Sequence, residues 1–252
     1  AGIAFTILEP HQAARWRRPG EDWNSGPVDP SQAYRVELPG GKSIAVFFYD
    51  GSLSRAVAFE GLLKDGGVFA ESLTKLALGR GEPSLTHVAT DGESYGHHHR
   101  YGEMALAYAM AKIEADPRVK LTHYAAYLAE HPAVLEVEIK ENTSWSCSHG
   151  VERWRSHCGC EAGGHKDQSW RTPLRAALDG LRDKAAAFYE QEAKALLSDP
   201  WSARDDYVEV VLDRSTAVSD SFLERRHAKT LAEADKVRAL KLLELQRHCM
   251  LM

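Results

Sequence analysis

The chain has 252 residues, of which 44% are hydrophobic and 27% charged, and its formal net charge is −5. This length can bury a sizeable core, either in one large domain or in a barrel segment followed by a helical domain. Lys and Arg number 31 against 36 Asp and Glu, which argues against a nucleic-acid or anionic-membrane surface. No apolar run approaches a membrane span, and the four cysteines, three of them clustered, favour a reducing, cytoplasmic setting.

The first fifty residues predict two buried strands and a hairpin. Residues 3–8 are a short apolar run typical of a buried strand, and residues 11–30 read as a long loop. Two apolar runs, 34–38 and 43–49, flank Pro39-Gly40-Gly41 and predict a hairpin. Because the second run is apolar on both faces, we expect it in a parallel sheet that is covered on both sides.

Helices and a third buried strand are expected next. Ser52 or Ser54 can cap a helix over about 55–63, a second helix spans about 68–78, and residues 85–90 predict a strand. Strand, helix and strand in succession are typical of an α/β fold. Asp50 and Asp91 each follow the C-terminal end of a predicted strand, and catalytic groups gather at that edge of α/β barrels.

The character of the chain changes beyond about residue 100. The spacing of Leu106, Met110 and Ile113 predicts a helix. The stretches that follow predict a helix, a short strand, a loop rich in Cys, His and Trp, and then helices, at residues 121–130, 134–140, 141–170 and from 173 onward, with a new helix starting at Pro200.

Two domains are expected from this pattern. Residues 1–115 would form the C-terminal part of an α/β barrel, and residues 116–252 a mostly helical domain that includes the loop 141–170. The chain starts on a run that looks like a core strand and ends within the apolar stretch of an amphipathic helix. Both ends are therefore expected to be truncations of a longer protein.

The densest motif occupies residues 90–102, with two carboxylates, three histidines and three glycines. Glycines let the backbone turn sharply and let a ligand approach closely. A carboxylate held in such a pocket can have a raised pKa and act as a general acid. We predict this role for Asp91, against the alternative of a charged group on a solvated turn.

Three consecutive histidines, His97, His98 and His99, also suggest a metal site. Because neighbouring side chains diverge along a strand or around a helix, at most one or two of them could bind the same ion. We therefore favour hydrogen bonding or substrate contact by His97 and His98, and we expect no catalytic cofactor. A metal-dependent hydrolase that uses Asp91 with His97–His99 is the alternative.

Residues 90–98, with Thr-Asp-Gly-Glu followed by Tyr-Gly-His-His, resemble the fourth characteristic motif of glycoside hydrolase family 57. Residues 47–59 resemble a strand–helix junction of that family. Residues 143–160 resemble a subgroup, similar to amylases and mannosidases, that carries an additional domain of unknown function. The resemblance implies a (β/α)7-type barrel and retaining hydrolysis or transfer at α-glycosidic bonds, on cytoplasmic α-glucans, with Asp91 as the general acid/base.

The resemblance also implies a Glu nucleophile on a motif that precedes the strand at residues 3–8. No such motif is present in this sequence. A retaining mechanism needs two carboxyl groups about 5–5.5 Å apart. We therefore predict that the nucleophile lies upstream and that the 252-residue piece is inactive alone. The second alternative is a non-catalytic carbohydrate-binding or structural protein.

Further side chains are predicted to contact an oligo- or polysaccharide. Asp50 would do so at its strand end, and Glu93 either binds a sugar hydroxyl or orients neighbouring groups. His11 either reaches the same edge or is an ordinary loop histidine. Aromatic faces stack well on sugar rings, and Trp145, in a polar loop, is the candidate platform, whereas Trp154 is expected to lie in the core.

The loop 141–170 has two interpretations. Its thiols and imidazoles could hold a structural zinc ion through Cys147, His149, Cys158 and Cys160, with His157 and His165 as further candidates. The Cys158-Gly159-Cys160 spacing is tighter than the two to four intervening residues usual in zinc sites. The favoured interpretation is therefore a set of reduced thiols packed beside Trp145 and Trp154.

Overall fold

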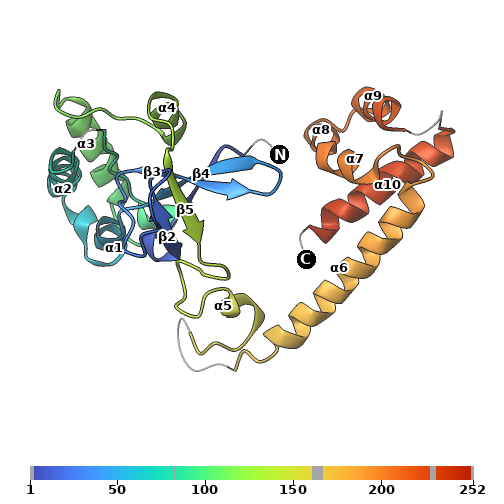
Figure 1. Ribbon diagram of the computed structural model, residues 1–252, viewed down its shortest axis with the longest axis horizontal. Coiled ribbons are helices and arrows are strands. Elements are labelled where there is room, and N and C mark those ends of the chain that lie inside the picture. Colours follow the sequence, from blue (N-terminus) through green and yellow to red (C-terminus); the bar gives the residue numbers. More distant parts are fainter. Residues whose placement is uncertain (1–2, 82, 161–166, 228–230, 251–252) are drawn as a thin grey trace. The chain divides into compact units, whose positions relative to one another are not determined.

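The computed structural model describes residues 3–81, 83–160, 167–227 and 231–250 (Figure 1). The chain divides into two compact units, Gly2–Val151 and Glu152–Met252. The first unit contains a β-sheet and covering helices, and the second is helical in its described part. This confirms the predicted α/β class with a mostly helical region after it. None of the described helices has the combination of length and apolar character that crossing a bilayer requires.

The sheet of the first unit mixes parallel and antiparallel pairs. β1 runs parallel to β4, the β3–β4 hairpin predicted around Pro39-Gly40-Gly41 is confirmed, and β5 is parallel to β3 and antiparallel to β2. The strand order is β1-β4-β3-β5-β2. The strands are, in chain order, β1 (Phe5–Leu8), β2 (Ala13–Arg17), β3 (Ala33–Leu38), β4 (Lys42–Phe48) and β5 (Leu135–Ile139).

Strand β2 lies where a long loop was predicted. Its residues pair with β5, as Figure 1 shows, with Trp16 opposite Val137. The flanking arginines form cross-strand ion pairs, Arg15 with Glu138 and Arg17 with Glu136, at 2.7 and 2.6 Å. The Arg-Trp-Arg alternation is a half-buried strand pattern, but it forms a strand because β5, more than a hundred residues later, supplies the backbone partners and, opposite the arginines, the carboxylates.

The sheet must be strongly curled. Its edge strands β1 and β2 are at opposite ends of the strand order, yet β1 ends at Leu8 and β2 begins at Ala13. Four interstrand spacings in a flat sheet amount to about 19 Å, whereas the five residue steps between these positions reach at most about 17 Å. Leu8 and Ala13 accordingly pack on the same core cluster, around Tyr34 and Phe48.

Alternate residues of β4 supply two different cores. Val46 and Phe48 face the cluster inside the curl, while Phe47 faces a second cluster with Leu85 and Tyr127. All three β4 side chains are at most 1% exposed. This explains the continuous apolar run, because the strand is covered on both faces, as predicted.

In the described part of the sheet unit the α-helices are α1 (Gly51–Phe59), α2 (Gly66–Leu78), α3 (Gly102–Glu114) and α4 (Tyr124–Glu130). Helices α2 and α3 pack through Phe69 and small residues such as Ala109, and a Cβ at Gly66 would lie 2.8 Å from the carbonyl oxygen of Ala105. The expectation that Ser52 or Ser54 caps α1 is wrong. The helix begins directly after Asp50 without a side-chain cap.

The strand predicted at residues 85–90 is absent from the described sheet, and its segment lies across the end of β4 instead. Its backbone groups bond to a loop carbonyl, to side chains and to the backbone N–H of Asp50, which donates to His87 O at 3.1 Å, rather than to a strand ladder. Leu85 N donates to Ser31 O (3.0 Å), His87 N to Asp50 Oδ2 (3.0 Å) and Ala89 N to Ser54 Oγ (3.1 Å).

A buried ion pair fixes this segment. Asp50 is 5% exposed and its carboxylate pairs with the guanidinium of Arg80, whose side chain is 17% exposed. Arg80 Nη1 also donates to Leu85 O at 2.9 Å and to Thr86 Oγ1 at 3.3 Å. One arginine therefore joins the end of β4 to the start of the segment that leads to Asp91.

The second unit has its own core. Helices α6 and α10 pack against each other, and the buried side chains include Tyr189, Leu197, Phe222 and Leu243. The helices predicted from residue 173 onward, with a new one at Pro200, are confirmed. They are α6 (Arg171–Ala193), α7 (Pro200–Asp206), α8 (Val208–Leu212), α9 (Thr216–Arg226) and α10 (Glu233–Cys249), and a further short helix, α5 (Glu152–Arg155), lies within the stretch 141–170 that was predicted as a loop.

Removing Arg80 should destabilise the sheet unit. Arg80→Ala leaves the carboxylate of Asp50 buried without its cation, which typically costs about 3 kcal/mol or more of unfolding free energy. Urea unfolding followed by tryptophan fluorescence would show the loss. The matched control is Arg118→Ala, which removes an exposed ion pair with Asp116 and should leave the unfolding midpoint almost unchanged. Equal effects of the two variants would contradict a stabilising role for the buried pair.

Candidate functional site

Asp91 lies at the end of the segment that Arg80 holds. It occupies the N-cap position of a short 3-10 helix, η3 (Gly92–Ser94), with φ −61° and ψ 139°. Its carbonyl oxygen accepts from Ser94 N at 3.0 Å, while its side chain makes no capping bond and is exposed. The turn thus leaves the carboxylate accessible to solvent and to any ligand, because the carboxylate makes no hydrogen bond to the backbone of the turn.

The rest of the motif forms a tight loop around the carbonyl of Glu93. That oxygen accepts from His97 N at 3.2 Å and from His98 N at 2.8 Å. The side chains of Glu93, His97 and His98 are exposed, and the two imidazole rings lie 5.0 Å apart. The structure therefore places these three predicted substrate-binding residues on the same exposed loop as Asp91.

This loop is clamped at its far end. His99 Nε2 donates to Ala58 O at 2.9 Å, near the end of α1. A Cβ at Gly102, the first residue of α3, would lie 3.0 Å from Ser94 O and 3.2 Å from Tyr95 Cα, so the absence of a side chain lets the loop rest directly on the helix. The third histidine is thus a structural anchor.

The buried side chain of His87 anchors residues 85–90 through hydrogen bonds of both of its ring nitrogens. It is 8% exposed, its Nε2 lies 3.1 Å from Pro30 O, and its Nδ1 lies 2.9 Å from the hydroxyl of Tyr124. A carbonyl can only accept, so Nε2 carries the proton and the tyrosine hydroxyl donates to Nδ1. Burial lowers the pKa of His87, and it outweighs the hydrogen bond to Pro30, which acts in the opposite direction. The ring is therefore held in its neutral form.

Asp50, predicted to contact a sugar, is placed behind the loop. Its carboxylate is engaged by Arg80 and by the backbone N–H of His87, and it is buried. Its geometry is that of a tether for the segment 85–90. The two strand-end aspartates of the sequence are thus in different environments, since Asp91 is exposed.

Glu9 and Tyr49 were not selected from the sequence, yet they lie at the same sheet edge, where β1 and β4 end side by side. Burial, followed by the negative charge of Glu9, raises the pKa of Tyr49 to about 12. Tyr49 is therefore a neutral hydroxyl at physiological pH. Glu9 could have been found by the rule that singled out Asp50 and Asp91, because it directly follows a predicted strand.

His11 lies on the short 3-10 turn between β1 and β2, η1 (Pro10–Gln12), and is exposed. Its Nδ1 is 2.6 Å from a carboxylate oxygen of Glu9. Its carbonyl accepts from Lys140 Nζ at 3.0 Å, at the beginning of the loop that carries Trp145. The contacts therefore link His11 to Glu9 and to the base of that loop.

The two tryptophans of the loop are both exposed, Trp145 by 61% and Trp154 by 57%. Exposure is what a stacking platform needs, and the stacking role of Trp145 stays a prediction. The expectation that Trp154 lies in the core is wrong. It does lie on a helical turn, α5, but the described part of that helix buries none of its four residues.

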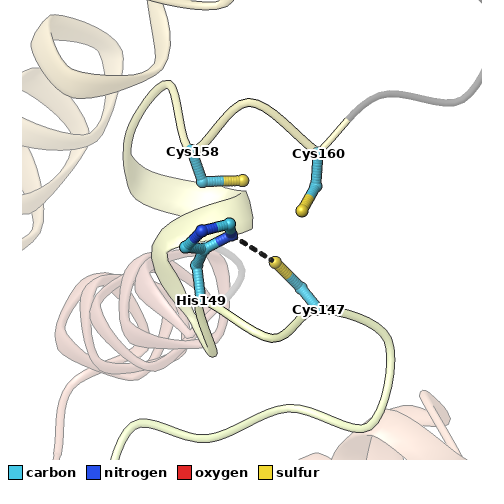
Figure 2. A group of neighbouring side chains, drawn as sticks. All are labelled: Cys147, His149, Cys158 and Cys160. Atoms are coloured by element: carbon cyan, nitrogen blue, oxygen red, sulfur yellow. Dashed lines mark hydrogen bonds between the residues drawn. The ribbon is translucent and has the colours of Figure 1, made fainter.

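The loop at residues 141–170 also brings four potential metal ligands together. The ligand atoms of Cys147, His149, Cys158 and Cys160 all lie within 4.8 Å of one another (Figure 2). Within the described ranges this is the one set of three or more His, Cys, Asp or Glu side chains that is so arranged; Asp91 and His97–His99 do not form one. His157 is not a member, and His165 lies outside the described residues.

Comparison with known proteins gives two family matches and a shared fold. A family model described as glycosyl hydrolase family 57 matches residues 1–140, and one described as a domain of unknown function (DUF3536) matches residues 167–252. No curated protein matches the chain.

Two solved structures are similar. The crystal structure of an exo-type maltose-forming amylase from Pyrococcus sp. ST04 superposes with a TM-score of 0.62 at 16% identity, over 99% of this chain and 46% of that one. A 4-alpha-glucanotransferase from Thermococcus litoralis gives 0.41 at 21% identity, over 57% of this chain and 22% of that one. The first shows a shared fold, and the chain spans less than half the length of that amylase.

The lowered pKa of His87 predicts a pH-dependent stability. The unfolded chain takes up a proton at this residue near its usual pKa of about 6.5, whereas the folded chain does so only at lower pH. The contribution of the neutral His87 ring to the free energy of unfolding is thus complete above the usual histidine pKa of about 6.5, and it is lost as the pH falls below that value. Asp50 and Arg80 act on the ring in opposite directions.

Urea unfolding at about pH 7 and about pH 5 would measure the effect. His87→Gln keeps a hydrogen-bonding group but cannot titrate. The free energy of unfolding that this variant loses relative to the natural chain should therefore be smaller at the lower pH. His248→Gln, at an exposed position of α10, is the control and should show no such convergence. If His87→Gln lost the same free energy of unfolding at both pH values, the imidazole could not be held buried in its neutral form.

Proposed function

Because the chain belongs to glycosyl hydrolase family 57, we propose that it is part of a retaining enzyme that hydrolyses or transfers α-glycosidic bonds of α-glucans, with Asp91 as general acid/base. The observation that carries the proposal is the placement of Asp91. Its exposed carboxylate stands at the start of a loop that α1 and α3 clamp, beside the exposed side chains of Glu93, His97 and His98.

In the proposed reaction, Asp91 first protonates the oxygen of the leaving sugar. It then takes a proton from the water or the acceptor sugar that releases the product. A retaining reaction needs a second carboxylate about 5–5.5 Å away to form the glycosyl-enzyme. We propose that a Glu in a part of the protein outside these 252 residues supplies it, and that the curled sheet belongs to a (β/α)7-type barrel.

Polar and aromatic groups suited to a sugar support this assignment. Glu93 accepts hydrogen bonds, and the imidazoles of His97 and His98 can donate or accept them, which matches the hydroxyls of a glucan chain. Trp145 offers an exposed ring face for stacking, and His11 lies at the base of its loop. Asp50, being buried, would act as a positioning residue, a change from the predicted sugar contact.

The amylase and the glucanotransferase are named for action on α-glucans, which supports an oligo- or polysaccharide substrate for the parent protein. The choice between hydrolysis and transfer depends on whether water or a sugar hydroxyl enters the acceptor position. The acidic net charge and the reduced cysteines fit a cytoplasmic enzyme without a nucleic-acid or membrane partner.

Replacing Asp91 tests the assignment. In the full-length protein, Asp91→Asn keeps the shape of the side chain but removes the transferable proton, and should lower reducing-sugar release from maltooligosaccharides by about 100-fold or more. The loss of kcat/KM should be much smaller with an aryl α-maltoside whose leaving group needs no protonation, because this constant reports formation of the glycosyl-enzyme and not the later step in which Asp91 acts as base. Asp183→Asn, on an exposed part of α6, makes the same chemical change and should leave both rates unaltered.

The two substrates separate chemistry from folding, because a misfolded variant would lose both activities equally. Unchanged hydrolysis of maltooligosaccharides by Asp91→Asn would refute the general-acid role. The 252-residue chain is expected to be inactive on both substrates, since we propose that the second carboxylate lies outside it. Turnover by this chain alone would place the nucleophile within it.

A further inference from the structure

We propose that Cys147, His149, Cys158 and Cys160 bind a structural Zn²⁺ ion. Figure 2 shows the three sulfurs and the imidazole pointing toward a common centre, from two short stretches of one loop. This reverses the preference for packed thiols drawn from the sequence, because the intervening residues fold back and bring the two pairs of ligands together. The proposal does not depend on the glycosidase assignment.

The distances suit a single ion. In a tetrahedral site with Zn–S near 2.3 Å and Zn–N near 2.0 Å, neighbouring ligand atoms lie about 3.5–3.8 Å apart. Cys147 Sγ and His149 Nδ1 are 3.7 Å apart, and no pair in the set exceeds 4.8 Å. A contraction of about 1 Å or less at any pair would therefore complete the coordination sphere.

The backbone is built to make these side chains converge. Gly150 has φ +65°, and a Cβ there would lie 1.9 Å from Asn142 O, so only glycine fits. Its N–H donates to Cys147 O at 2.9 Å, and Val151 N donates to Asn142 O at 2.9 Å. This closed turn directs Cys147 and His149 to the same side.

A second turn does the same for the other pair. Gly159 has φ +81° and separates Cys158 from Cys160. A single left-handed residue reverses the chain locally and lets both flanking thiols face the centre. In an extended Cys-X-Cys stretch the two side chains would instead point the same way, about 7 Å apart, and would not converge. The tight spacing that argued against zinc is thus accommodated by the glycine.

The ligand chemistry selects the metal. Three thiolates and one imidazole form a soft set with no carboxylate, which disfavours Mg²⁺ and Ca²⁺ and matches the Cys₃His type of structural zinc site. Binding displaces the thiol protons to solvent and involves no oxidation or reduction. All four positions come from the protein, so the ion has no open position for substrate or water and its role is structural.

Metal coordination would stabilise a described part of the loop that buries no side chain of its own. Helix α5, Glu152–Arg155, lies between the two ligand pairs and has no buried residue in the described structure. Trp154 on that helix is 57% exposed. A short segment with no apolar anchor cannot offset the entropy of ordering its backbone, whereas a metal ion coordinated on either side of it can.

The first test is the metal content of the 252-residue chain, purified without chelators and saturated with ZnCl₂ before dialysis. Mass spectrometry of the elements should find about one zinc ion per chain. His149→Gln and Cys160→Ser should each retain less than about a tenth of it. The matched controls are His157→Gln, in the same loop but outside the set, and Cys249→Ser, a buried thiol in α10; both should keep the metal.

A second readout covers variants that fail to fold. Co²⁺ added to the natural chain should give the intense visible absorption of a tetrahedral thiolate complex, which Zn²⁺ should abolish by displacement. Chelation should open the segment between the ligand pairs, so trypsin should cut after Arg153 or Arg155 at least about ten times faster, reversibly on adding Zn²⁺.

Any of the following results would overturn the proposal: no zinc retained by the natural chain and no cobalt spectrum, equal zinc content in His149→Gln and His157→Gln, or intact mass showing that two of the clustered cysteines have formed a disulfide in the purified protein. Faster cleavage on chelation that Zn²⁺ does not reverse would overturn it as well.

Discussion

The buried ion pair between Asp50 and Arg80 is the interaction on which the candidate site depends. Burying two charges is costly unless each is fully engaged, and here Arg80 also bonds Leu85 O while Asp50 also accepts from His87 N. The pair therefore holds residues 85–90 against the end of β4, although these residues do not form a strand. Asp91 takes its position from that segment.

Asp50 and Asp91, both predicted to follow strands, lie in different environments. Asp50 gives up solvent contact to hold the segment, whereas Asp91 keeps its carboxylate exposed because its turn is closed by backbone groups and needs no side-chain cap. His99 and Gly102 then fix the other end of the loop on α1 and α3. A general acid must be accessible and yet held in place, and this arrangement meets both requirements.

The Cys/His cluster follows the opposite principle. The loop around Asp91 leaves polar groups turned outward for a ligand, whereas the cluster turns its four polar side chains toward one another. Its scaffold is two left-handed glycines and the hydrogen bonds of one closed turn, and no described residue of α5 is buried. The backbone brings the four ligands together, and the proposed zinc ion would hold them there.

Local patterns in the sequence determined much of this protein. Pro39-Gly40-Gly41 fixed the hairpin, apolar spacing fixed the helices, and the residues around Asp91 indicated the family, because turn chemistry and periodicity act over a few residues. Tertiary structure decided the rest. Strand β2 needed β5 as its pairing partner, residues 85–90 are held by Asp50 and Arg80 instead of forming the predicted strand, and Cys158 lies near His149 only because the loop folds back. Each of these depends on partners distant in sequence or on a backbone reversal, which residue spacing alone does not encode.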